Sequence, residues 1–352
     1  MRLRQGRRGL GTRRQCHLKQ REGMWYHIRI MSNMISRRGF LLGVAAAGYA
    51  AAAQDMAVRD ENFSVFLSDP HVPGDGTELD KNHVEHDPAY MYKRLAATVD
   101  EVLAMRPMPA RVVVFGDIAY LRGERADYEK TKPLFDKLAA EGIDVVFGMG
   151  NHDHRAAFFD TYPGWRERTC VPGEVVTKVS LGHADLLLLD TLTENTSAPG
   201  VTNPGNGSLS ERQAEWLALE ATKATRPFFV GAHHHIHEVG TKVGGKSLGA
   251  FLIKQPLFRG YMHGHHHFWK TDRLLDWGRY TVRRVATLPS VGFWGDLGHA
   301  LFRTAPHLAQ LRPVIKEFCF PRHQPDPTKR PATWAAIVAD AQNATCRFPL
   351  DG

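Results

Sequence analysis

Cysteine is scarce in this sequence, which contains only four cysteines in 352 residues. Cys16 lies in an N-terminal leader, and Cys170, Cys319 and Cys346 lie in the rest of the chain. None has the CxxC spacing of a zinc or redox site, which excludes a cysteine-based motif of either kind. Two alternatives stay open for Cys319 and Cys346, a disulfide in an oxidising compartment or two buried free thiols. The odd number leaves at least one of the three cysteines unpaired.

The leader also lacks an apolar run long enough to cross a bilayer. The uncharged, Ala-rich run of residues 39–53 is about 15 residues long, whereas a membrane-spanning helix needs about 20. It follows two arginines and ends in an Ala-x-Ala pattern, which suits a cleavage site. Ser36–Leu41 therefore resembles a twin-arginine export signal. We predict a signal peptide over residues 36–54, recognised by the twin-arginine export machinery, and a periplasmic or secreted protein, with an uncleaved membrane anchor as the alternative.

Acidic residues are nearly absent from the first 38 residues, which contain eleven Lys and Arg but one Glu. This segment accounts for the net charge of +8, because the chain from Gln54 onward has 34 basic and 36 acidic residues. We therefore expect no nucleic-acid-binding surface on the folded part. Residues 1–35 show no packing pattern, and three later methionines are alternative starts. We expect this basic segment to be disordered or not translated.

Strand-like apolar runs alternate with amphipathic helical segments from Asn62 onward. This alternation predicts an α/β protein with a parallel sheet covered by helices. The pattern weakens after Pro289. We predict one domain over residues 58–290, followed by a C-terminal extension over residues 291–352 that packs on it.

Residues with metal-binding side chains follow five of the predicted strands. They are Asp69 and His71, Asp117, Asn151, His233, and His265 and His267, in that order along the chain. Open α/β sheets place their binding crevice at the carboxyl ends of strands, so we expect these side chains to form one metal site. Carboxylate oxygen combined with imidazole nitrogen suits zinc, manganese or iron better than copper or calcium.

Spacing within the motifs supports a shared pocket. Residues i and i+2 project to the same side of an extended chain, so Asp69 and His71 are expected to point together, as are His265 and His267. Glycine precedes three of the ligand residues and allows turns that a Cβ atom would obstruct. These glycines are Gly116, Gly150 and Gly264.

Five motifs, D-x-H, G-D, G-N-H-D, a histidine after a strand and G-H-x-H, occur in this order within residues 62–290. Together they resemble the calcineurin-like metallophosphoesterase family. The resemblance implies a four-layer α/β/β/α sandwich, in which two mixed β-sheets are flanked by helices. It also implies a dinuclear metal centre with two divalent or mixed-valence ions, Mn, Fe or Zn.

The resemblance implies a role for each side chain. One metal would be held by Asp69, His71 and His267, and the other by Asn151, His233 and His265. Asp117 would bridge the two ions, which lie about 3.5–4 Å apart in two-metal sites. His152 matches the family's non-ligand histidine, which protonates or stabilises the leaving oxygen.

Two assignments stay open. Relatives read H-x-P or H-H-P where this chain reads HHHIH. Aligning His235 with that proline makes His233 the ligand, and His234 is the alternative. Tyr120 lies three residues after Asp117, the offset of the tyrosine ligand in purple acid phosphatases, and is an alternative iron ligand.

The sequence GNHDHR, which ends in Arg155, resembles the cyclic-nucleotide and glycerophosphodiester phosphodiesterase branch. GDIAYLRG lacks the second aspartate of protein phosphatases, which disfavours that class. Arg155 is predicted either to contact the substrate phosphate or to be a surface or salt-bridged residue.

We therefore predict a metal-dependent enzyme that hydrolyses phosphodiester bonds in a small-molecule phosphate ester, with a metal-bridging hydroxide as nucleophile. A phosphomonoesterase on the same fold is the main alternative. A non-catalytic periplasmic metal-binding protein is the alternative from another class, although such proteins usually carry histidine in mobile polar tracts. The sequence leaves the oligomeric state open.

Overall fold

The computed structural model describes residues 58–79, 89–195, 202–276, 278, 281–292, 294–319 and 344–351. The predicted basic segment and export signal lie outside the described residues. Residues 57–352 form one compact unit. Within its described part, no helix is long and apolar enough to cross a membrane.

The first sheet has six strands in the order β14-β13-β12-β1-β2-β3. Its parallel part is β1 (Arg59–Leu67), β2 (Met108–Val114) and β3 (Asp144–Phe147), and its antiparallel part is β12 (Gly295–Ala305), β13 (Leu308–Cys319) and β14 (Cys346–Pro349). The last residues of β1, β2 and β3 are buried, because both faces of the parallel part are covered.

The second sheet also has six strands, in the order β10-β11-β9-β6-β5-β4. Parallel pairing joins β5 (Asp185–Leu188), β6 (Phe228–Ala232), β9 (Phe258–His263) and β11 (Thr281–Thr287). The edge strands β4 (Thr177–Ser180) and β10 (Lys270–Asp276) are antiparallel. A separate small hairpin consists of β7 (Lys242–Val243) and β8 (Lys246–Ser247).

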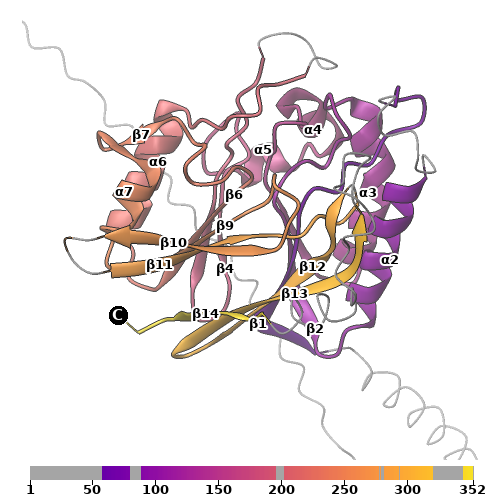
Figure 1. The fold of residues 1–352 in the computed structure, drawn as a ribbon. Coiled ribbons are helices and arrows are strands. Elements are labelled where there is room, and N and C mark those ends of the chain that lie inside the picture. The colour runs from indigo at the N-terminus through magenta and orange to yellow at the C-terminus, as the bar shows by residue number, and fades with distance from the viewer. Residues whose placement is uncertain are drawn as a thin grey trace, which may run out of the picture. The chain divides into compact units, whose positions relative to one another are not determined.

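Helices cover the outer faces of the two sheets (Figure 1). On the first sheet lie α2 (Tyr90–Ala104) and α3 (Arg125–Ala140), and on the second lie α6 (Glu211–Thr222) and α7 (Leu248–Leu252). Two short helices, α4 (Arg155–Thr161) and α5 (Trp165–Arg168), follow β3. The predicted four-layer α/β/β/α arrangement with two mixed sheets is confirmed.

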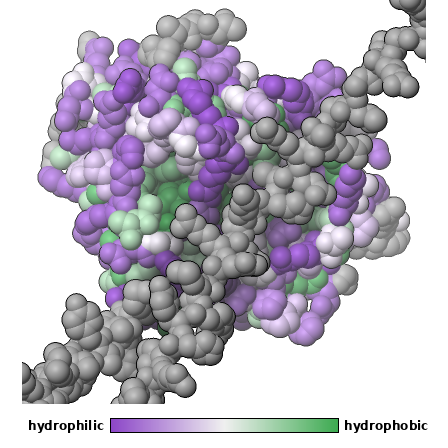
Figure 2. Space-filling view, turned by 180° about the vertical axis from the view of Figure 1, so that it is seen from behind, coloured by the Kyte–Doolittle hydropathy of each residue, from purple (hydrophilic) through white to green (hydrophobic). Residues whose placement is uncertain are grey.

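An aromatic chain joins the two sheets. Phe66 of β1 stacks on Phe302 of β12 with centroids 5.0 Å apart, and Phe302 meets Phe229 of β6 at 5.3 Å. Phe229 in turn contacts Phe348 of β14 at 5.1 Å. Few large apolar side chains remain exposed among the described residues. The face in Figure 2 is mostly hydrophilic around a smaller hydrophobic area.

The segment after residue 290, expected to pack on the domain, adds β12, β13 and β14 to the first sheet. Cys346 is a buried free thiol that lies opposite Leu311 in the register of β13. Cys319 ends β13 eight residues further on, which is about 26 Å along a strand. The strand therefore holds the two cysteines apart, which agrees with the alternative of two free thiols rather than a disulfide.

His299 of β12 is a buried titratable group whose ring nitrogens have no hydrogen-bond partner among the described residues. Burial lowers its pKa from 6.5 to about 4. As the pH falls, His299 is therefore protonated in the unfolded chain before it is protonated in the folded chain. The contribution of neutral His299 to the free energy of unfolding is lost as the pH falls from 6.5 to 4.

Through His299, lowering the pH from 6.5 to 4 should reduce the free energy of unfolding of the wild type by about 3 kcal/mol, at 1.36 kcal/mol per pKa unit. We predict that His299→Leu abolishes this part of the loss. Urea unfolding followed by circular dichroism at several pH values measures this difference. The exposed His183→Leu serves as the matched control and should keep the wild-type pH dependence. An unchanged pH dependence in His299→Leu would contradict the prediction.

Candidate metal centre

The seven predicted ligands lie together at the carboxyl ends of five strands from both sheets. The loops after β1, β2 and β3 supply Asp69, His71, Asp117 and Asn151, and those after β6 and β9 supply His233, His265 and His267. All are buried except His265, which is partly exposed. Several groups of histidine and aspartate here have ligand atoms within 4.8 Å of one another, close enough to hold a metal ion.

Asp69, His71 and His267 form the first group. Asp69 Oδ1 lies 3.1 Å from His267 Nε2 and 3.8 Å from His71 Nε2. The two Nε2 atoms are 3.3 Å apart. Two segments distant in sequence, the loop after β1 and the loop after β9, thus place one oxygen and two nitrogen atoms around a common point.

Asn151, His233 and His265 form the second group. His233 Nε2 lies 3.1 Å from Asn151 Oδ1 and 3.2 Å from His265 Nδ1. This group contains a neutral amide oxygen and two imidazole rings. The negative charge that would balance a bound cation must therefore come from a neighbouring carboxylate.

The Asp117 carboxylate lies between the two groups. Its Oδ2 is 3.0 Å from His233 Nε2 and 3.5 Å from His71 Nε2. Its Oδ1 accepts a 2.8 Å hydrogen bond from the backbone N–H of His152. A single side chain therefore reaches both groups, as a bridging ligand must.

Backbone carbonyls fix which nitrogen three of the histidines turn to the centre. Nδ1 of His71, His233 and His267 lies 2.9, 3.0 and 3.1 Å from the carbonyl oxygens of Tyr120, Phe115 and Trp294. A carbonyl only accepts, so each Nδ1 carries a proton. Nε2 of His71 and Nε2 of His267 then face each other beside the Asp69 carboxylate. Two imidazole nitrogens and a carboxylate oxygen that converge in this way need a cation between them, so the donor set fits metal ions.

Protonation of the histidines follows burial and charge. Burial lowers the pKa of His71 to about 3 and that of His265 to about 4, so both are in the neutral form that binds metal at neutral pH. Burial also disfavours the charged form of His233, but Asp117 outweighs it and raises the pKa of His233 to about 9. His233 would have to release the proton that it shares with Asp117 before it could hold a metal ion.

Backbone strain is concentrated at this site. Five non-glycine residues among those described have positive φ, and all are predicted ligands: Asp69 (53°), His71 (46°), Asp117 (51°), His265 (68°) and His267 (62°). Such conformations cost about 1–3 kcal/mol each and persist where the surroundings hold them. The expectation of extended backbone at the two i, i+2 pairs is wrong, because left-handed backbone places both side chains of each pair in the pocket.

The prediction for the three glycines is confirmed. A Cβ atom on Gly116 would lie 2.5 Å from the nitrogen of Gly150, and one on Gly150 would lie 2.7 Å from the nitrogen of Asp117. A Cβ atom on Gly264 would lie 2.6 Å from Asp69 Oδ2. Any larger residue would push the ligand loops apart.

Asp153, to which we assigned no role from the sequence, ties the loop after β2 to the loop after β3. Its Oδ1 accepts hydrogen bonds from the N–H groups of Ile118 and Ala119, both at 3.0 Å, and from the Tyr128 hydroxyl at 3.1 Å. Its Oδ2 accepts the N–H of Gly150 at 2.9 Å. The final aspartate of G-N-H-D was the sequence signal for this residue.

Asp127 makes the corresponding connection between the loops after β1 and β2. It accepts the N–H of Gly74 at 2.6 Å and the N–H of Tyr120 at 3.1 Å. Asp127 lies in the first turn of α3, outside every motif, so the sequence contains no local signal for its role.

The structure places His233, rather than His234, beside Asp117 and Asn151. His234 Nδ1 lies 2.9 Å from the Thr191 hydroxyl oxygen. His234 still has a nitrogen within 4.8 Å of ligand atoms of His233 and His265, next to the second group. The geometry thus favours the alignment that makes His233 the ligand.

Arg155 is bound by protein carboxylates. Its Nε and Nη2 donate to the two oxygens of Asp190 at 2.7 and 2.8 Å, and its Nη1 donates to Glu194 at 3.1 Å. Arg155 is therefore a salt-bridged residue. The predicted contact with the substrate phosphate has no support, because Asp190 and Glu194 already occupy the guanidinium group. Tyr120 contacts the site through its carbonyl oxygen, and its ring is part of the buried core.

A hollow of about 330 Å³ adjoins the second group. Phe268 and Trp294 form an aromatic wall with ring centroids 5.4 Å apart, and Lys270 adds a positive charge. His265 links the hollow to the predicted ligands. Its volume is in the range of small-molecule sites.

Comparison with known sequences agrees with this site. The sequence profile described as "Calcineurin-like phosphoesterase" matches residues 65–268. A "Probable cyclic nucleotide phosphodiesterase" of Rhodococcus erythropolis is 29% identical over 50% of this chain and 53% of its own length. A protein of the same description from Rhodopseudomonas palustris is 32% identical over 51% of this chain and 59% of its own length. The chain thus spans little more than half the length of these relatives.

Solved structures match the fold. A dimetal phosphatase from Danio rerio has a TM-score of 0.52 and 14% identity, over 73% of this chain and 97% of that chain. PhoD has a TM-score of 0.51 and 12% identity, over 75% of this chain and 67% of that chain. Identities this low show a shared fold alone. Because the family profile covers more than half of the sequence, the chain belongs to the calcineurin-like phosphoesterase family.

Proposed function

We propose that this protein hydrolyses phosphodiester bonds in small-molecule phosphate esters. The observation that carries the proposal is the position of Asp117, whose carboxylate contacts both His71 and His233 at the junction of the two ligand groups. Membership of the calcineurin-like phosphoesterase family supports the same class of reaction.

In this proposal Asp69, His71 and His267 would hold one ion, Asn151, His233 and His265 would hold the other, and Asp117 would serve both. The mixture of oxygen and nitrogen donors suits Mn, Fe or Zn. When bound, the two ions supply positive charge that polarises the phosphoryl oxygens and activates water.

We assign to His152 the proton that the leaving oxygen receives. Its Nδ1 lies 3.0 Å from the Leu121 carbonyl, which fixes that nitrogen as a donor and leaves Nε2 for the ester. A ring nitrogen of His152 lies within 4.8 Å of ligand atoms of His71 and Asp117, at the edge of the first group. Protonated Nε2 would give its proton to the alkoxide as the ester bond breaks.

A cyclic nucleotide is the substrate that we propose first. Two relatives carry the name of cyclic nucleotide phosphodiesterase, which supports this class. The aromatic wall of Phe268 and Trp294 suits a planar base, and Lys270 suits a singly charged diester.

We also propose that the protein is exported through the twin-arginine machinery. Arg37 and Arg38 followed by the uncharged run of residues 39–53 support this location. A periplasmic or secreted enzyme would meet phosphate esters outside the cytoplasm.

The preference for diesters is directly measurable. We predict that the protein loaded with Mn, Zn or Fe hydrolyses bis(4-nitrophenyl) phosphate with a higher kcat/KM than 4-nitrophenyl phosphate. The reason is that Asp190 and Glu194 engage Arg155 and Asp272 pairs with Lys270 at 3.0 Å, so little unpaired positive charge is left to favour a dianion over a monoanion. Faster turnover of the monoester would favour the phosphomonoesterase alternative.

Asp117→Asn is expected to lower turnover of the diester at least about 100-fold, because it removes the negative charge that both ions share. Asp136→Asn, an exposed residue of α3 paired with Lys132, is the matched control and should retain wild-type turnover. Comparable activity in Asp117→Asn and in the control would contradict the proposed centre.

The role of His152 is tested by varying the leaving group. His152→Ala is expected to slow hydrolysis of a 3′,5′-cyclic nucleotide, which releases an alkoxide, by about 100-fold or more. The same variant should lose less than about tenfold on bis(4-nitrophenyl) phosphate, because nitrophenolate leaves without a proton. The exposed His237→Ala is the control. Equal losses on both substrates would remove His152 from the acid role.

A further inference from the structure

A second concave site lies at the other end of the second sheet. It is a pocket of about 480 Å³ between β9, β10, β11 and β14. Arg259, near the start of β9, lines it, whereas the predicted metal ligands follow the end of that strand at His263. Four residues of strand span about 13 Å. The pocket shares no residue with the metal centre.

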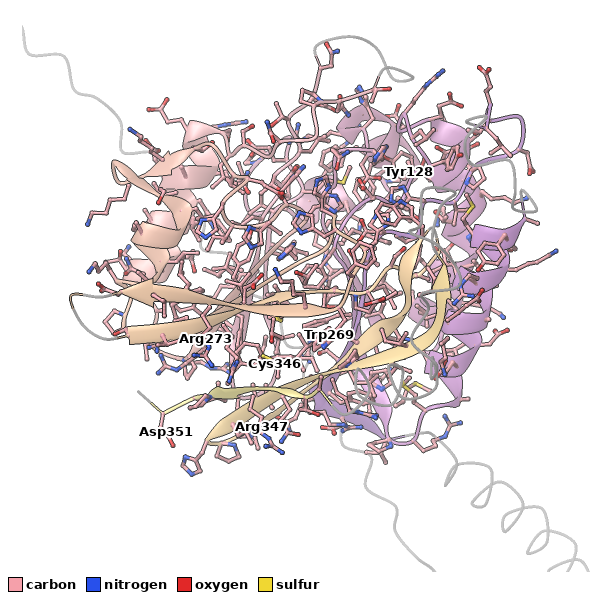
Figure 3. All side chains as sticks on the ribbon, viewed as in Figure 1. Tyr128, Trp269, Arg273, Cys346, Arg347 and Asp351 are labelled. Atoms are coloured by element: carbon pink, nitrogen blue, oxygen red, sulfur yellow. The ribbon has the colours of Figure 1, made fainter. Side chains whose placement is uncertain are left out.

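Positive charge dominates this pocket. Its arginines are Arg259, Arg273, Arg283, Arg284 and Arg347. Asp351, the acidic residue among the described lining residues, is paired with His307 at 3.0 Å. In the described part of the chain, none of the five arginines forms an ion pair. Figure 3 shows Arg273 of the second sheet and Arg347 of β14 in this region, with Asp351 further toward the C-terminus.

Strand pairing places two of these charges face to face. Arg273 of β10 lies directly opposite Arg284 of β11 in the antiparallel register. Like charges in directly opposed positions destabilise a sheet. A bound anion would remove this repulsion, and its binding to the folded chain alone would stabilise the fold.

Arg259 contributes a charge that is largely removed from solvent. The residue is 5% exposed, and its Nε and Nη2 donate to the carbonyl oxygen of Leu350 at 3.1 and 3.0 Å. Its Nη1 donates to the carbonyl oxygen of Pro256 at 2.7 Å. Carbonyl groups satisfy the N–H donors but do not neutralise the guanidinium. Burial and the charge of Arg283 lower the pKa of Arg259.

We propose that this arginine pocket binds a small anion that carries at least two phosphate groups. Arg259 and Arg283 donate to backbone carbonyls and so contribute mainly charge, whereas the side chains of Arg273, Arg284 and Arg347 form no hydrogen bond within the described part of the chain. Guanidinium groups pair with phosphate oxygens in a bidentate manner, and three such groups exceed the need of a single phosphate. The volume also suits an oligophosphate, with or without a nucleoside. Since Arg347 belongs to the first sheet and Arg273 and Arg284 to the second, the anion would brace the two sheets against each other.

The test uses the metal-loaded protein with inorganic triphosphate, ATP and orthophosphate as probes, in calorimetric titrations and thermal unfolding. Triphosphate is expected to bind more tightly than orthophosphate and to raise Tm. Tighter binding of ATP than of triphosphate would assign the pocket to nucleotides, and equal binding would assign it to oligophosphates in general.

Arg273→Ala/Arg284→Ala is expected to weaken triphosphate binding at least about 100-fold, from the loss of two charged hydrogen-bonding partners. Arg284→Gln alone should raise Tm without anion and reduce the increase that triphosphate causes, because it removes the repulsion. The exposed Arg125→Ala on α3 removes one positive charge, as Arg284→Gln does, and should bind triphosphate as the wild type does. Should the double variant fail to fold, Arg347→Gln on β14 tests the same pocket.

Triphosphate binding that survives in the double variant but is lost in Asp117→Asn would place the anion at the metal centre and overturn the proposal. Absence of binding to the wild type would also overturn it. Turnover of bis(4-nitrophenyl) phosphate should be unchanged in the double variant. Failure of the arginine pocket is therefore distinguishable from failure of the proposed hydrolase function.

Discussion

The rest of the structure depends on one buried carboxylate, that of Asp117, which contacts donors from both sheets. Burial opposes its ionisation, but His233 and His152 lower its pKa well below the usual value, so it is charged in the folded chain. An isolated charge at such depth would be strongly destabilising. Two ions held on either side of this carboxylate would compensate it, which makes metal binding part of the stability of the site as well as of its chemistry.

The surrounding architecture holds the ligand loops close to this charge. Asp153 and Asp127 collect backbone N–H groups from the loops after β1, β2 and β3 and so join these loops to one another. Gly116 and Gly150 let two of the loops approach to backbone contact. These fixed contacts maintain the left-handed backbone at the ligands, which would otherwise relax at a gain of about 1–3 kcal/mol per residue.

Much of this arrangement could be predicted from the sequence, because the motifs lie directly at the ends of strongly apolar strands and so indicate one edge of the sheets. The left-handed backbone conformation of His71 and His267 could not be predicted, because residue type alone does not fix φ. The salt bridge of Arg155 could not be predicted either, because its partner Asp190 lies 35 residues away in the sequence. β12 was also missed, because its apolar pattern is interrupted and its partner β1 is more than 200 residues earlier. The arginine pocket likewise forms only when β14 pairs beside β13.

Anomalous X-ray scattering from crystals of the manganese-loaded protein tests the central claim most directly. Two peaks about 3.5–4 Å apart are expected, one beside Asp69, His71 and His267 and one beside Asn151, His233 and His265, with Asp117 in contact with both. A single peak, or peaks that share no contact with Asp117, would contradict the dinuclear centre.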